Sequence, residues 1–151
     1  MRDDPQGLPT AEHALHAELA QKVLHAWAHN RQQVRVPLVL DLARVDAPQR
    51  ALLLQAIAAA LAAGGPVDEG RAAAAMARVG AAPAELPRSP PDLFRLLAEL
   101  EEADLGAHAY AAATLVLDRR QAAPRAFLDW LAARFGLPVS LTSGLARRYR
   151  G

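Results

Sequence analysis

Apolar residues recur every three to four positions along most of the chain, a spacing that indicates α-helices rather than strands. The first helical pattern carries one apolar stripe, formed by Leu15, Leu19, Val23 and Trp27. Thr10 is placed to cap this helix, which we expect to end near Asn30. Residues 31–46 are less regular, because Pro37 interrupts any central strand. We expect an extended piece there, followed by a short helix over residues 38–44.

Capping and breaking residues divide the rest of the chain into further helices. Asp46 followed by Pro48 is typical of a helix start, and Gly64 is typical of its end. Asp68 then opens a helix that Gly80 terminates. By the same signals, later helices are opened by the run Ser89-Pro90-Pro91-Asp92, by Asp104, by Pro124 and by Pro138, and the first three end near Glu102, Leu117 and Gly136.

Two stretches of the chain resemble each other in pattern. AIAAALAAGGPVDEGRAAAAMARVG begins at Ala56, and AYAAATLVLDRRQAAPRAFLDWLAARFG begins at Ala109. Each contains an alanine-rich helix, a short connector, an Arg-Ala pair and a second helix closed by glycine. This indicates an internal duplication, with similar composition alone as the alternative. The first helix of each copy is apolar nearly all round, so we expect both at the centre of a bundle.

These patterns predict an all-α fold, a single-domain bundle of about seven helices with two pseudo-repeated helical hairpins. We expect residues 1–9 to be extended or disordered and residues 10–46 to form the N-terminal helix and a connector. Residues 47–151 are expected to form the main helical domain, with the N-terminal helix packed against it as one domain. Aromatic residues make up only 5% of the chain, so the core must be built mainly from Ala and Leu.

Composition and charge exclude several classes of function. The absence of cysteine excludes disulfides, thiolate metal sites and a cysteine nucleophile. A formal net charge of +1 gives no strong overall field, so we expect no nucleic-acid partner. The charge is nevertheless uneven, since residues 84–104 carry six acids against two arginines, whereas seven arginines face only Asp129 from Arg119 onward. We interpret both stretches as solvated faces, with a local surface effect as the alternative.

Candidate chemistry is sparse. His25 and His29 lie four residues apart on the first helix and could form half of a zinc site, but no third ligand follows at a suitable spacing. We interpret His108, on a predicted central helix, as a hydrogen-bonded core histidine rather than a base. No phosphate-binding loop or nucleophile elbow is present. We therefore do not expect an enzyme.

Trp130 is the strongest candidate for an interaction surface. The core side of its predicted helix is formed by Phe127, Leu128, Leu131 and Phe135. Trp130 is then left on the flank beside Arg134, and these two residue types often anchor interfaces. A stacked, exposed pair of this kind contributes about 0.5–1 kcal/mol. The alternative is that the N-terminal helix covers the ring.

The chain resembles the tellurite-resistance TerB-like family, in particular its uncharacterised YebE-like branch. The residues that carry the resemblance are Val67-Asp68, Leu117-Asp118 and the run Arg125-Ala126-Phe127-Leu128-Asp129. It covers about residues 47–148 and leaves the first 45 residues unexplained. The resemblance implies an all-helical fold of two related halves. It also implies divalent-metal binding, because the two connectors carry the acids of the family pattern.

The connectors of this chain depart from that pattern. Gly64-Gly65 stand where the family has Asp-Gly, and Arg120 brings a positive charge to the second connector. The acids that remain are Asp68, Glu69 and Asp118. Because calcium requires six to eight oxygen ligands, we interpret Asp68 as a helix cap and expect neither a metal nor another cofactor.

Together these observations favour a non-enzymatic helical binding or scaffold module of the TerB-like type, which the resemblance links to envelope or metal stress. The alternative is a small-ligand or divalent-metal sensor that uses the groove between the two halves. We expect a protein partner or a second copy of the chain, and a cytoplasmic location. Attachment to the inner membrane stays open, since YebE-like relatives often carry an apolar N-terminal segment that is missing here. The binding candidates are Trp130, Arg134, Asp68, Asp118, His25 and His29.

Overall fold

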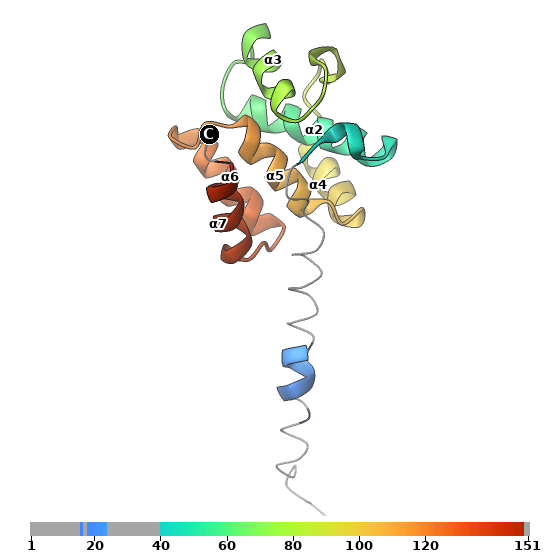
Figure 1. Ribbon diagram of the computed structural model, residues 1–151, viewed down its shortest axis with the longest axis vertical. Helices are drawn as coiled ribbons and strands as arrows, with labels where there is room; N and C mark the ends of the chain where they lie inside the picture. Colours follow the sequence, from blue (N-terminus) through green and yellow to red (C-terminus); the bar gives the residue numbers. More distant parts are fainter. Residues whose placement is uncertain (1–15, 17, 24–39, 150–151) are drawn as a thin grey trace, which may run out of the picture. The chain divides into compact units, whose positions relative to one another are not determined.

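The computed structural model describes residue 16, residues 18–23 and residues 40–149 (Figure 1). The described residues of the first segment are helical, as predicted. Leu19 is 50% exposed and Val23 is 65% exposed on this helix. The packing of the helix against the main domain stays a prediction. His25, His29 and the extended piece predicted before residue 38 lie outside the described residues.

Residues 40–149 fold into a bundle of α-helices, and this described range contains no strand. The six α-helices are α2 (Ala47–Ala63), α3 (Glu69–Arg78), α4 (Leu93–Glu102), α5 (Gly106–Val116), α6 (Ala122–Arg134) and α7 (Val139–Arg148). Two short 3₁₀ helices, η1 (Leu42–Arg44) and η2 (Pro83–Glu85), precede α2 and α4. With the helical residues of the first segment, this confirms the predicted all-α fold of about seven helices.

The two apolar helices α2 and α5 form the centre of the bundle, as their sequences predicted. Seven residues of α2 and seven of α5 are buried. Helix α5 contacts all five other α-helices, and it lies between α3, α4 and α6 in Figure 1. Ala60, Ala109 and Ala112 are fully buried in this core. Their small side chains permit the close approach of neighbouring helices.

Three predicted helix starts are confirmed by side-chain caps. Oδ1 of Asp46 accepts a hydrogen bond from the backbone N–H of Gln49 at 2.9 Å, at the start of α2. Asp68 caps α3 and Asp92 caps α4 in the same way. Each such cap contributes about 1 kcal/mol because it pairs an N–H group that the helix itself leaves without a partner.

Two predicted helix starts are wrong. Asp104 was expected to cap α5, but the N-cap residue is Leu105 and Asp104 has a φ angle of +58°. Asp104 therefore belongs to the end of α4, where the N–H of Leu105 returns to the carbonyl of Leu100 at 2.8 Å. Helix α6 begins at Ala122, ahead of Pro124. Proline is tolerated there because N–H groups of the first turn have no partner within the helix.

The connecting segments also differ from the prediction. A short helix is predicted over residues 38–44. In the described part of this range the structure has only the 3₁₀ turn η1, which Asp41 caps. The turn η2 was not predicted. Its Glu85 accepts a hydrogen bond from the N–H of Ala82 at 2.8 Å and pairs with Arg50 of α2 at 2.6 Å. Both contacts lower the pKa of Glu85, and the hydrogen bond from Ala82 has the larger effect.

Candidate functional site

In the connector between α2 and α3, the guanidinium of Arg71 binds backbone carbonyl oxygens. Nη1 of Arg71 donates hydrogen bonds to the carbonyl oxygens of Gly65 at 3.0 Å and Pro66 at 2.9 Å. Oδ1 of Asp68 accepts a hydrogen bond from the backbone N–H of Arg71 at 2.7 Å. Asp68 is thus the helix cap that the sequence predicted. Carbonyl oxygens that a hard metal ion could ligate are bound to a guanidinium instead.

The connector between α5 and α6 lies close to the first one. Arg71 and Asp118 line the same shallow cavity of about 390 Å³, which places the two connectors together. Asp68 does not line this cavity, whereas Arg78 does. Oδ1 of Asp118 accepts a hydrogen bond from the backbone N–H of Arg120 at 3.0 Å. Among the described residues no group of three or more potential metal-ligand side chains comes together. That the chain binds no metal stays a prediction.

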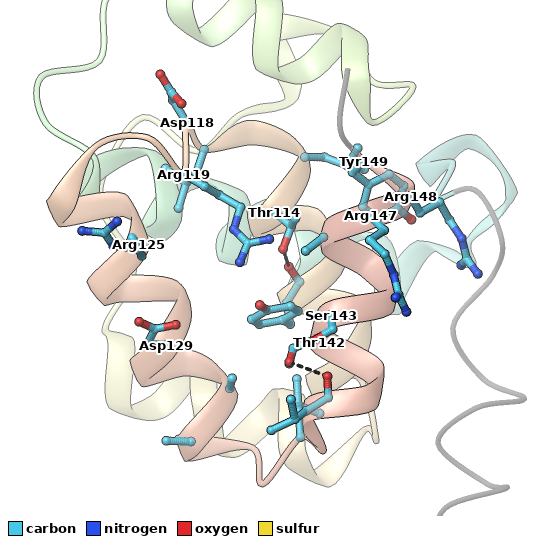
Figure 2. Close-up of a pocket in the computed structure, with 18 of the residues that line it drawn as sticks. Thr114, Asp118, Arg119, Arg125, Asp129, Thr142, Ser143, Arg147, Arg148 and Tyr149 are labelled. Carbon is cyan, nitrogen blue, oxygen red and sulfur yellow. Dashed lines mark hydrogen bonds between the residues drawn. The ribbon is translucent and has the colours of Figure 1, made fainter.

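A larger cleft, of about 1390 Å³, lies between α5, α6 and α7 (Figure 2). Six arginines line it: Arg78, Arg119, Arg120, Arg125, Arg147 and Arg148. Two acids, Asp118 and Asp129, also line it, so its side chains sum to a net charge of +4 (six positive, two negative). Figure 2 shows the guanidinium of Arg119 pointing into the cleft, whereas the side chains of Arg147 and Arg148 extend from the outer side of α7, away from Arg119. We call this site the arginine cleft.

The arginines of the cleft differ from other arginines of the bundle in their partners. Elsewhere Arg50, Arg95 and Arg134 pair with Glu85, Glu99 and Glu101 at 2.6, 2.8 and 3.1 Å. Within the described part of the chain, no carboxylate pairs with an arginine of the cleft. Arg78 donates to the carbonyl oxygen of Leu115 at 3.0 Å. The other five guanidinium groups are available to bind an anion, and carboxylates suit their planar geometry.

Tyr110 and Thr114 of α5 line the inner part of the cleft. Oγ1 of Thr114 donates a hydrogen bond to the carbonyl oxygen of Tyr110 at 2.9 Å, drawn as a dashed line in Figure 2. Tyr110 is only 2% exposed, and burial raises the pKa of its hydroxyl although the charge of Arg119 opposes the change. On α7, Oγ1 of Thr142 donates to the carbonyl of Val139 at 3.1 Å. Both threonine hydroxyls therefore donate to backbone carbonyls of their own helices.

A comparison with known protein families shows which family the chain belongs to. A family model described as a protein of unknown function (DUF533) matches residues 6–149. This chain belongs to the DUF533 family. DUF533 is a TerB-like family, which confirms the broader part of the resemblance. No curated protein and no solved structure matches the DUF533 chain. The match also begins at residue 6, so the estimate that the family pattern leaves out the first 45 residues is wrong.

The DUF533 chain places Trp130 and Arg134 outside the arginine cleft, whereas Asp118 lines it. Trp130 is 42% exposed, and its ring centroid lies 5.9 Å from that of Phe127. Nη1 of Arg134 lies 3.1 Å from Oε2 of Glu101 on α4. The charge of Arg134 is therefore directed at α4. Among the described residues no helix is both long and apolar enough to cross a membrane.

Sequence reasoning for this DUF533 chain did not select the arginine cleft. The excess of arginine from Arg119 onward was visible, but it was interpreted as a solvated face. Arg119 and Arg147 are 28 residues apart, and only the packing of α6 and α7 beside α5 brings them to one cleft. The signal that could have found the site is the scarcity of acids near these arginines, since only Asp129 follows Arg119 in the sequence.

Proposed function

We propose that this DUF533 protein is a non-enzymatic binding module of the TerB-like type that takes an acidic segment of a protein partner into the arginine cleft. The observation that supports the proposal is the contrast in arginine pairing. Arg50, Arg95 and Arg134 pair with glutamates, whereas none of the six arginines at the cleft has a carboxylate partner within the described residues. A partner that supplies the missing carboxylates forms charge-assisted hydrogen bonds there.

A protein segment fits the cleft better than a nucleic acid does. Asp129 lies among the arginines and repels anions near it, so the cleft suits a segment with unevenly spaced acids better than the regularly spaced phosphates of a nucleic acid. Two tyrosines line the cleft; Tyr110 is buried and Tyr149 is half-buried, so neither presents a fully exposed ring for base stacking. The cleft also has apolar lining from Leu115, Ala132 and Leu137, which suits a peptide that mixes acidic and apolar side chains.

The finer aspects of function follow from this proposal and from the resemblance. We place the protein in the YebE-like branch and in the cytoplasm, with a scaffold role in envelope or metal stress. The second candidate function, a metal sensor between the two halves, has less support because Arg71 and Arg78 line the cavity between the connectors. A metal ion in that cavity would be repelled by both guanidinium groups.

Peptide binding tests the proposal directly. The probe is a fluorescein-labelled peptide rich in Glu with a single Phe, and the readout is fluorescence anisotropy. We expect saturable binding that weakens as the salt concentration rises from about 0.05 to 0.5 M, because exposed charges are screened. The double variant Arg119→Gln/Arg147→Gln should bind about five- to tenfold more weakly, since each exposed pair contributes about 0.2–1 kcal/mol.

A matched variant shows whether the effect belongs to the cleft. Arg44→Gln/Arg88→Gln removes the same charge from exposed positions that do not line the cleft. It should bind the peptide as the wild type does. Equal losses in both variants would mean a general charge effect, and tighter binding of a single-stranded oligonucleotide than of the peptide would contradict a protein partner.

A further inference from the structure

Helix α4 exposes a face that combines an aromatic side chain with acids. Phe94 is 83% exposed, although Leu96, Leu97 and Leu100 of the same helix are buried. At 100° per residue, the side chains on the side of Phe94 are those of Ala98, Glu101 and Glu102, all exposed. We call these four residues the α4 outer face. A single exposed aromatic is ordinary, but one beside acids has the composition expected of a ligand for the arginine cleft.

The charge of the two surfaces is complementary. The α4 outer face carries two acids, Glu101 and Glu102, a formal charge of −2, and Glu101 already pairs with Arg134 of α6 at 3.1 Å. The side chains that line the arginine cleft sum to +4. Each surface also carries one exposed apolar side chain, Val139 at the cleft, which is 78% exposed, and Phe94 on α4, which is 83% exposed. The chain thus carries both a basic cleft and an acidic, apolar helix face.

The two surfaces lie on different sides of the bundle. On α6, Arg125, Asp129 and Ala133 line the cleft. Trp130 and Arg134 occupy the other exposed side of α6 by helical spacing, and Arg134 pairs with Glu101 of the α4 outer face. An α4 outer face therefore cannot reach the cleft of its own chain. It can reach the cleft of another copy.

We propose that the acidic partner of the arginine cleft is a second copy of this chain, which inserts its α4 outer face with Phe94 as the apolar anchor. This inference rests on the proposed function of the cleft and names its occupant. Because the contact joins two different surfaces, it is head to tail, and each bound copy leaves one cleft and one α4 outer face open. Assembly then grows with protein concentration and weakens with salt.

Complementary variants test the inference with the full chain. The cleft variant is Arg119→Gln/Arg147→Gln, and the α4 variant is Phe94→Ser/Glu102→Gln. Sedimentation velocity of the wild type should show a mass that rises with concentration and falls with salt. Each variant alone should stay monomeric, with at least tenfold weaker self-association. An equimolar mixture should form a dimer and nothing larger, because one intact cleft meets one intact α4 outer face.

Several results would overturn the inference. A mixture that stays monomeric, or an α4 variant that assembles like the wild type, would remove α4 as the occupant. Self-association that survives in the cleft variant would indicate a symmetric contact between outer faces. If the wild type stays monomeric at all concentrations but binds the acidic peptide, this inference fails and the proposed function stands. If the peptide does not bind either, the proposed function fails too. Circular dichroism of both variants checks that these exposed substitutions leave the helices intact.

Discussion

Gly136 shows how one residue fixes the end of a helix. It follows α6 with a φ angle of +60°, and the N–H of Leu137 returns to the carbonyl of Ala132 at 2.9 Å. No atom lies within 4 Å of the position that a Cβ would take. Gly136→Ala therefore introduces backbone strain without a clash, and we expect it to lower the free energy of unfolding by about 1–2 kcal/mol. Thermal unfolding should show a melting temperature lower by about 2–8 °C.

Gly144 provides the control for this prediction. It lies inside α7, has no positive φ angle, and also has no atom within 4 Å of its Cβ position. Gly144→Ala should raise the free energy of unfolding by up to about 1 kcal/mol, because alanine is the better helix former. A loss of stability of equal size in both variants would show that the conformation of Gly136 is not the cause.

At the scale of elements, the central pair α2 and α5 depends on small side chains. Ala112 of α5 is fully buried in the core, and protein interiors are close-packed. Ala112→Leu should overpack this core and lower the free energy of unfolding by about 1–3 kcal/mol. Urea denaturation measures the change through the shift of the midpoint at constant slope.

An exposed alanine of a flanking helix tests whether leucine itself is the problem. Ala73 of α3 is exposed. Ala73→Leu should change the free energy of unfolding by less than about 0.5 kcal/mol, because both residues favour helices and the site is solvated. If Ala112→Leu proves as mild as this variant, close packing around α5 is not what holds the core together.

The elements also show what the sequence could and could not predict. Local signals placed α2, α3 and α4 well, since Asp46, Asp68 and Asp92 act on N–H groups only two or three residues away. Asp104 was misplaced because aspartate serves both as an N-cap and as a residue with positive φ after a helix. The arginine cleft depends on how α5, α6 and α7 pack, and no local pattern encodes that arrangement.

At the scale of the whole molecule, the connectors of the two hairpins that the sequence predicts to be related line one cavity, where the TerB-like resemblance implies a metal. The chain places Arg71 and Arg78 at that meeting point and binds the carbonyls of Gly65 and Pro66 with a guanidinium. A divalent ion would have to displace this internal cation. We therefore expect excess Ca²⁺, Mg²⁺ or Zn²⁺ to leave the melting temperature unchanged in a thermal-shift measurement.

The size of the alternative outcome makes this measurement decisive. An ion present at about a hundred times its dissociation constant stabilises the folded state by about 2.7 kcal/mol. For a chain of this length that corresponds to a rise of roughly 5–10 °C. A rise with Zn²⁺ that disappears in His25→Gln/His29→Gln would assign the ion to the N-terminal helix and leave the connectors without one. A rise that persists in that variant but disappears in Asp118→Asn would place the ion at the connectors, and the interpretation of Arg71 as the resident cation would be wrong.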